Sequence, residues 1–295
     1  MKLSHLFSAF VTLFVAAEAS AATMYLSNGS HIDQFTSGGV RSVFANTVVS
    51  GAQGLAFDTA GNLYVANSGN NTIEEFTPGG FGSVFASNLL SNPKGLAFDV
   101  VGNLYVANGN QTIAKFTPSG VGSIFANTGL SFPRGLAFDA TGNLYVANAG
   151  NHTIARFTPQ GVGSVFVSTP SNTDADCIAF DRSGNLYATY ASLSTIEKFT
   201  PGGVASVFST TGLDRPFGLA FDPNGNLYAT NTGNGSIEKF TLGGLGSVFA
   251  TGGVGSGFIA IQPGALLPES SAVASLGVGA VMLLGFRRRL RSSAA

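Results

Sequence analysis

Short apolar runs alternate with clusters of glycine, asparagine, aspartate and proline along most of the chain. Runs of this length bounded by turn residues are typical of short β-strands. The first two runs of a unit, such as GLAF and LYVA, lack clean alternation, which indicates strands covered on both faces. In the clearest unit, we predict four strands at residues 135–138, 143–148, 153–158 and 163–166.

This unit recurs with a period near 40 residues. Residues 135–148 (GLAFDATGNLYVAN) are nearly repeated at 54–67, 95–108 and 218–231, and a more divergent copy covers 177–190. The central alanines are separated by 41, 40, 42 and 41 residues, and they are Ala56, Ala97, Ala137, Ala179 and Ala220. Four short strands in each unit of about 40 residues predict the blades of a β-propeller.

The fragments at the two ends of the repeat region predict how the ring closes. Residues 24–45 match the second, third and fourth strands of a unit but lack the first. Residues 259–262 match the missing first strand, and Ala260 lies 40 residues after Ala220. We therefore predict an all-β, six-bladed propeller of four-stranded blades, closed by pairing of the N-terminal strands with a C-terminal strand.

Composition supports a folded chain and argues against nucleic-acid binding. Of 295 residues, 44% are hydrophobic, 10% are charged and 40 are glycine, which suits many strands and turns and not disorder. Between the two ends, the repeat region has 9 basic and 13 acidic residues, so it has no basic surplus for nucleic acid. Cys177 is the only cysteine and takes the place of the repeat glycine, so a buried small residue is favoured over a reactive thiol.

The two ends of the chain have the features of export signals. Residues 1–22 have Lys2, an apolar run at 6–17 and small residues at 19–22, which is the pattern of a signal peptide. Residues 23–264 form the propeller. Residues 265–295 form a sorting or anchor tail, with an apolar stretch at 272–286 that is short for a free-standing span. The short motif is Leu267, Pro268, Glu269 and Ser270, and the basic cluster is Arg287, Arg288, Arg289 and Arg291.

Both regions resemble known families. The pattern GLAFD-x-x-GNLYVAN-x-x-N-x-TI-x-x-FTP resembles the NHL repeat and its bacterial six-bladed propeller relatives, although those often have Asp where this chain has Asn67, Asn108, Asn148 and Asn231. The tail resembles the PEP-CTERM sorting signal of Gram-negative bacteria, with Ser270 in place of the usual second proline. This resemblance implies recognition and cleavage by an exosortase. A plain transmembrane helix that anchors the protein is the alternative.

Candidate ligand contacts lie where propellers usually bind, on loops that enter the first strands and join the second and third strands. One group precedes the repeat glycine, and it varies either because it contacts an asymmetric ligand or because the loops drift. The other group ends the second strand, where asparagine also suits turn geometry. Tyr190 interrupts this second group, close to the irregular loop 168–176. The first group is Gln53, Lys94, Arg134, Asp176 and Phe217, and the second is Asn67, Asn108, Asn148, Tyr190 and Asn231, preceded by Asn28.

Other acidic residues and the histidines have structural explanations. The five aspartates of the D-x-x-G-N element are expected to form turns, and they are Asp58, Asp99, Asp139, Asp181 and Asp222. Glu74, Glu197 and Glu238 repeat within third strands and are expected to face solvent. His31 and His152 are expected on the surface, without a carboxylate at metal-ligand spacing. Asp174 and Asp176 form an acidic pair that is weak evidence for calcium.

From these features we predict a secreted or surface-associated propeller that acts as a binding or structural scaffold at the bacterial envelope or in extracellular polysaccharide. Its expected partners are export and exosortase machinery, a glycan, peptide or protein ligand, and the membrane through the unprocessed tail. The alternative is a lactonase-like hydrolase or lyase, for which a divalent metal in the central channel is the expected cofactor. We assign no catalytic residue, no metal ligand and no other cofactor.

Overall fold

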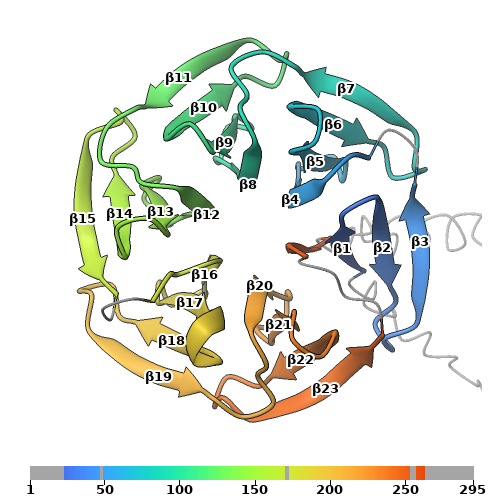
Figure 1. Cartoon of the computed structure of the whole chain (residues 1–295), viewed down its shortest axis with the longest axis vertical. Helices are drawn as coiled ribbons and strands as arrows, with labels where there is room; N and C mark the ends of the chain where they lie inside the picture. The colour runs from blue at the N-terminus through green and yellow to red at the C-terminus, as the bar shows by residue number, and fades with distance from the viewer. Residues whose placement is uncertain (1–22, 47–48, 170–172, 253–256, 263–295) are drawn as a thin grey trace, which may run out of the picture. The chain divides into compact units, whose positions relative to one another are not determined.

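The computed structural model describes residues 23–46, 49–169, 173–252 and 257–262, and these form six four-stranded antiparallel sheets arranged as a ring (Figure 1). The prediction of a six-bladed propeller is confirmed. The first strand of each blade lies at the centre of the ring: β4 (Ala52–Phe57), β8 (Pro93–Phe98), β12 (Pro133–Phe138), β16 (Ile178–Phe180), β20 (Pro216–Phe221) and β24 (Ile259–Ile261).

The other three strands of each blade follow outward. The second strands are β5 (Leu63–Asn67), β9 (Leu104–Asn108), β13 (Leu144–Asn148), β17 (Leu186–Tyr190), β21 (Leu227–Asn231) and β1 (Met24–Asn28). The third strands are β6 (Thr72–Phe76), β10 (Thr112–Phe116), β14 (Thr153–Phe157), β18 (Thr195–Phe199), β22 (Ser236–Phe240) and β2 (His31–Phe35). The outer strands are β7 (Gly82–Ala86), β11 (Gly122–Ala126), β15 (Gly163–Ser168), β19 (Ala205–Ser209), β23 (Gly246–Thr251) and β3 (Arg41–Ala45).

The ring closes as the end fragments predict. Strand β24 pairs with β1 in antiparallel register, with Met24 opposite Ile261 and Leu26 opposite Ile259. The closing sheet therefore has the order β24-β1-β2-β3, and the backbone N–H of Gln262 donates to the carbonyl of Thr23 at 2.8 Å. Closure joins the two ends of the propeller and pairs the inner edge of β1, which would otherwise favour aggregation.

Aromatic side chains pack between neighbouring blades. Tyr64 lies edge-on to Phe85 and Phe98, with ring centroids 4.9 and 5.0 Å apart. The same Tyr–Phe arrangement recurs around the ring, and such pairs contribute about 0.5–1.5 kcal/mol each beyond their buried area. The core is thus divided into clusters that each join two blades.

The repeat glycine is required by the close approach of the central strands. A Cβ on Gly95 would collide with the carbonyl oxygen of Arg134, and one on Gly54 would collide with that of Lys94. Cys177 replaces this glycine in the blade of β16–β19 and is 4% exposed, which confirms the prediction of a buried small residue. The glycines thus bring the starts of the central strands close together around the axis.

The aspartates of the D-x-x-G-N element form turns, as predicted. Asp139 Oδ1 accepts hydrogen bonds from the backbone N–H groups of Thr141 and Asn143, both at 2.9 Å, and Oδ2 accepts one from Asn143 Nδ2 at 2.8 Å. Burial acts to raise the pKa of Asp139, but these hydrogen bonds outweigh it and hold the pKa below its ordinary value. The same bonds recur at the equivalent aspartates, so this element is a turn and not a ring of ligands.

The prediction that the third-strand glutamates face solvent is wrong. Glu74 is 2% exposed, Glu238 is 3% exposed, and Glu197 is half-buried. Glu74 Oε1 accepts a hydrogen bond from Thr72 Oγ1 at 2.9 Å. At Glu238 the loop between β19 and β20 lies over the carboxyl group, since a Cβ on Gly212 would be 3.1 Å from it.

The strand directions define two faces of the ring. The starts of the first strands and the connections between second and third strands form the cavity face. The D-x-x-G turns and the turns between third and outer strands form the turn face. Among the residues described, no helix is long and apolar enough to cross a membrane. The predicted signal peptide at 1–22 and the sorting tail at 265–295 lie outside the described residues.

Candidate functional site

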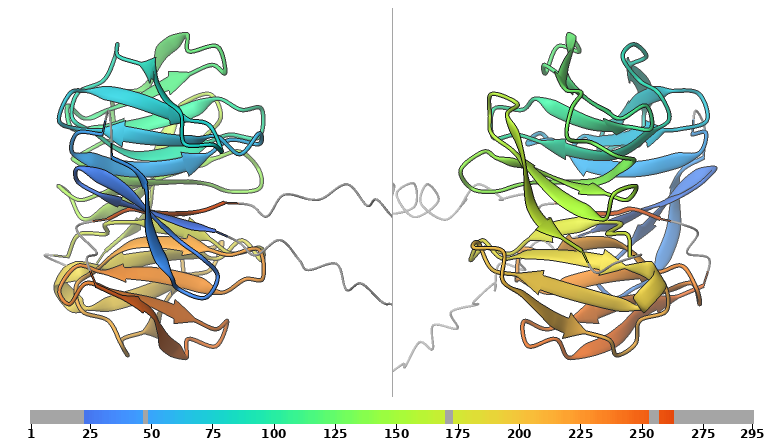
Figure 2. Two further views of the ribbon diagram at one scale, coloured as in Figure 1. Left: turned by 90° about the vertical axis from the view of Figure 1, so that its right-hand side faces the viewer. Right: turned by 60° about the vertical axis from the view of Figure 1, so that its left-hand side comes forward.

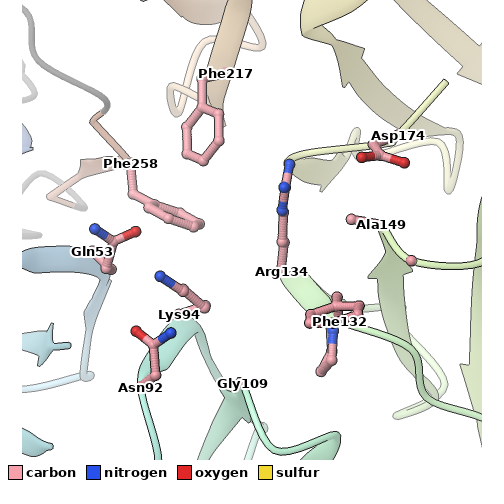
Figure 3. A pocket seen from close by; sticks show the side chains of 12 residues that line it. Gln53, Asn92, Lys94, Gly109, Phe132, Arg134, Ala149, Asp174, Phe217 and Phe258 are labelled. Carbon is pink, nitrogen blue, oxygen red and sulfur yellow. The ribbon is translucent and has the colours of Figure 1, made fainter.

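A cavity of about 450 Å³ opens on the cavity face, above the starts of the central strands (Figure 3). It contains four of the five predicted residues that precede the repeat glycine or its equivalent: Gln53, Lys94, Arg134 and Phe217. Because these residues occupy the same position in their blades, the fold brings them to one place although about 40 residues or more separate them. Its wall also includes Asn92, Phe132, Asp174 and Phe258.

Two cations lie side by side in this cavity. Burial lowers the pKa of Lys94, and the nearby positive charge of Arg134 lowers it further. No ion pair or hydrogen bond joins the Lys94 amine to any residue that the structure describes. Lys94 therefore presents a half-buried positive charge without a counter-charge, which an anionic group in the cavity would stabilise.

Arg134 differs from Lys94 because it has an acidic partner. Its Nη1 forms an ion pair with Oδ1 of Asp176, the fifth residue of the predicted group. Asp176 is 3% exposed, and burial raises its pKa more than the Arg134 charge lowers it. The backbone N–H of Ala191 donates to Asp176 Oδ2 at 3.4 Å. Asp176 thus positions the guanidinium that faces the cavity and does not line the main cavity itself.

Aromatic rings form the opposite part of the wall. Phe217 and Phe258 pack edge to face, with ring centroids 5.1 Å apart and an interplanar angle of 90°. Phe132 is 61% exposed and has a left-handed backbone conformation with φ of 46°. Figure 3 shows Phe217 and Phe258 facing Lys94 and Arg134 across the cavity. The site therefore combines cations, aromatic faces and the side-chain amides of Gln53 and Asn92.

Phe258 is a wall residue that the sequence prediction omitted. It lies two positions before Ala260. In most other blades the residue two positions before the central alanine is the repeat glycine. A phenylalanine at a position that is glycine in four blades and cysteine in one is a visible signal in the sequence. The predicted match of the closing strand began only at Ile259, so this position lay just outside it.

A second cavity of about 380 Å³ shares Arg134 and Asp174 with the first. Its wall also includes Asp176, Ser192 and Arg215. Asp174 Oδ1 lies 2.9 Å from His152 Nδ1, so the two aspartates of the predicted acidic pair have different partners. Asp174 and Asp176 thus line the same cavity but pair with different residues.

The asparagines that end the second strands line neither cavity. Asn108 accepts a hydrogen bond from the N–H of Ser91 at 3.1 Å and donates to the carbonyl of Leu89 at 2.9 Å and to Thr112 Oγ1 at 3.1 Å. Asn148 and Asn231 make the equivalent bonds. These side chains fix the loops of the cavity face, and they and Asn67 are fully buried.

Tyr190 was expected near the site but is fully buried in the core. Burial and the neighbouring Glu197 carboxylate raise the pKa of its hydroxyl. Each histidine has one carboxylate partner, since His31 Nε2 lies 3.3 Å from Asp33 Oδ1 and His152 pairs with Asp174. Within the described ranges, no group of three or more His, Cys, Asp or Glu side chains could hold a metal ion.

Comparison with known proteins supports the fold. The family model of the NHL repeat matches residues 130–157. No curated protein matches the chain. A chain from the crystal structure of the nidogen/laminin complex superposes with a TM-score of 0.74 at 20% identity, over 82% of this chain and 98% of that one.

Two lyase structures are also similar. Selenomethionine-substituted virginiamycin B lyase from Staphylococcus aureus matches with a TM-score of 0.58 at 15% identity, covering 72% of this chain and 84% of that one. A streptogramin B lyase structure matches with a TM-score of 0.61 at 17% identity, covering 78% and 74%. At such low identities these likenesses show the propeller fold alone, because the same fold supports both binding proteins and enzymes.

Proposed function

We propose that this chain is an exported binding propeller whose central cavity holds an acidic saccharide, such as a uronic acid unit of a polysaccharide. The observation that carries this proposal is the position of Lys94. Its amine is half-buried beside Arg134, has no counter-charge in the described part of the chain, and faces aromatic rings across the cavity. A carboxylate in the cavity would supply the missing negative charge.

The rest of the wall suits the other groups of a sugar. Gln53 and Asn92 carry amides that both donate and accept hydrogen bonds, as hydroxyl groups require. Phe132 and Phe217 offer apolar faces for the C–H groups of the ring. A cavity of about 450 Å³ falls within the usual range of small-ligand sites, so it accepts one or two sugar units and not a protein domain.

Export and surface location are part of the proposal. The signal-peptide pattern at 1–22 supports export, and the PEP-CTERM-like tail at 265–295 supports sorting at the envelope of a Gram-negative-type bacterium. An acidic polysaccharide outside the cell is a ligand consistent with this location. The propeller then acts as a scaffold that holds such a polymer at the surface, and exosortase-type machinery is the expected processing partner.

Calorimetric titration with a short uronic acid oligosaccharide tests the ligand class. The matched control is the same oligosaccharide with its carboxyl groups methyl-esterified, which keeps the ring and removes the charge. We expect the free acid to bind and the ester to bind at least tenfold more weakly. Equal affinity for the two compounds, or no binding of the acid, would contradict the proposal.

A further inference from the structure

The turn face carries a ring of exposed apolar side chains. Each turn between a third strand and an outer strand ends in a large apolar residue that is 66–80% exposed. We call these six residues the apolar ring: Val40, Phe81, Val121, Val162, Val204 and Leu245. The outer strands continue the pattern, since each has a second exposed apolar residue three positions later, as Val84 follows Phe81. Single exposed apolar side chains are normal on a soluble protein, but here one recurs at the same turn position in all six blades.

The turns do not need these apolar side chains for their own structure. In five of the six turns, a threonine Oγ1 accepts a hydrogen bond from the backbone N–H of the apolar residue, as Thr117 does for Val121 at 3.1 Å. A glycine with positive φ completes each turn, such as Gly120 with φ of 80°. Backbone geometry is therefore set by threonine and glycine, and a polar residue would fit at the fifth position.

The same turns contain no charged residue. Their sequences are TSGGV, TPGGF, TPSGV, TPQGV, TPGGV and TLGGL, at residues 36–40, 77–81, 117–121, 158–162, 200–204 and 241–245. The neighbouring D-x-x-G turns direct their aspartate oxygens back onto their own backbone, as at Asp139. By contrast, the cavity face carries Lys94, Arg134 and Asp174. The turns that carry the apolar ring are thus uncharged themselves, although one D-x-x-G turn of the same face contains the exposed Arg182.

Both ends of the described chain lie on the turn face. Met24 and Ile261 are paired with each other, and Met24 is also opposite Phe35, which leads directly into the turn that ends at Val40. A Cβ on Gly61 of a D-x-x-G turn would lie 3.4 Å from the Gln262 side chain. The side views agree, because β1 begins and β24 ends on the same side of the ring (Figure 2).

A short linker in the sequence joins Gln262 to an apolar segment. Residues 263–271 separate Gln262 from the apolar stretch at 272–286, which is followed by four arginines. Nine residues span at most about 30 Å even when fully extended. If the apolar stretch lies in a bilayer, the turn face is held within that distance of it.

We propose that the turn face rests on a lipid bilayer while the tail is attached, with the apolar ring at the boundary between headgroups and acyl chains. Six equivalent side chains at one end of a rigid ring match a planar partner, which contacts all of them at once. The absence of charged residues from these turns indicates contact with neutral lipid, and apolar burial supplies the attraction. The cavity face then points away from the membrane.

Tryptophan reporters test this orientation in the full chain, which contains no tryptophan of its own. Val121→Trp places the reporter in the apolar ring. Leu193→Trp places it in the 3₁₀ helix η1 (Ala191–Leu193) on the cavity face, where Leu193 is 47% exposed. Both variants are reconstituted into vesicles of neutral phosphatidylcholine, with and without bromine on the acyl chains. We expect bromine to quench the Val121→Trp signal at least threefold more than the Leu193→Trp signal. Equal quenching, or none for Val121→Trp, would overturn the proposal.

Two further measurements separate lipid contact from other causes. Adding Phe81→Ser and Leu245→Ser to Val121→Trp should reduce quenching at least twofold, whereas Leu89→Ser with Leu193→Ser, on the other face, should not change it. If quenching fell equally in both double variants, lipid contact would not be specific to the turn face, and the proposal would be contradicted. Light scattering in detergent, without vesicles, shows whether two copies of the chain associate through the apolar ring. If the protein is a dimer and Phe81→Ser with Leu245→Ser converts it to a monomer, the ring is a protein interface and the proposal is overturned. None of these measurements needs a saccharide, so they are independent of the cavity.

Discussion

Replacement of Lys94 by methionine should change fold stability and ligand binding in opposite directions. The amine is half-buried, and burial followed by the Arg134 charge lowers its pKa. A cation held in this way destabilises the folded state, so its removal should leave the free energy of unfolding unchanged or raise it by up to about 1 kcal/mol. For a propeller of this size that gain corresponds to a rise in Tm of about 2–4 °C.

The effect of Lys94 on stability should depend on pH with a defined sign. The pKa of a lysine in the unfolded chain is about 10.4, and the folded value is lower. Between the two values the unfolded state binds more protons, so the free energy of unfolding rises with pH in that interval. The destabilisation by Lys94 is therefore fully present below the folded pKa and disappears above the unfolded one. Lys94→Met should remove this part of the pH dependence.

Binding should respond in the other direction. A hydrogen bond to a charged group contributes about 1.5–3 kcal/mol, so loss of the Lys94 amine should weaken binding of a uronic acid oligosaccharide by about 10- to 150-fold. Isothermal titration calorimetry measures this change, and differential scanning calorimetry measures Tm on the same samples.

Lys115→Met is the matched control for this experiment. The Lys115 amine lies 5.2 Å from the centre of the Tyr105 ring, on a third strand and away from the cavity. Its loss should remove a cation–π contact, lower stability by about 0.5–1 kcal/mol and leave binding unchanged. The reasoning would be refuted if Lys94→Met lowered Tm by more than the control does, or if it bound the oligosaccharide as tightly as the natural protein.

Four other predictions concern the fold and the ends of the chain. Gly95→Ala should lower stability by about 1–3 kcal/mol in chemical denaturation because its Cβ meets the Arg134 carbonyl, whereas Gly79→Ala, whose nearest neighbour is 3.6 Å away, should be near neutral. The Cys177 thiol, whose pKa is raised by burial and by Asp176, should react with a thiol reagent only after unfolding, and reaction at the rate of an introduced surface cysteine would contradict its burial. Mass spectrometry of the exported protein should show a C-terminus within residues 267–271, and an intact arginine tail would exclude cleavage. Metal analysis of the purified protein should find no stoichiometric divalent ion, and finding one would favour the metal-dependent alternative.

Periodicity makes the fold predictable because each repeat has its own local explanation. The Asp139 turn, the repeat glycine and the strand lengths follow from steric and hydrogen-bonding rules that act within about 40 residues. Ring closure is predictable as well, since the missing first strand at one end matches the extra strand at the other. The burial of Glu74 cannot be predicted in this way, because the alternation of residues shows which face of the strand a side chain occupies but not what covers that face.

The candidate site is predictable in part for a similar reason. Equal positions in their blades are enough to place Gln53, Lys94, Arg134 and Phe217 around one axis. The ion pair between Arg134 and Asp176 depends on side-chain reach across two blades, and the sequence does not specify it. The asparagines were candidates because they repeat, yet repetition reflects the loop hydrogen bonds that they make.

The residue types at equivalent blade positions vary on the cavity face but stay apolar on the turn face, and this difference indicates what kind of partner each face contacts. On the cavity face, the position before the repeat glycine or its equivalent is glutamine, lysine, arginine, aspartate, phenylalanine or, at Gly257, glycine. On the turn face, the fifth turn position is a large apolar residue in all six blades, although threonine and glycine already set the turn. A ligand without sixfold symmetry needs different contacts from each blade, whereas a planar partner needs the same contact six times. The variable cavity therefore suits a small asymmetric molecule such as a sugar acid, and the uniform ring suits an extended surface.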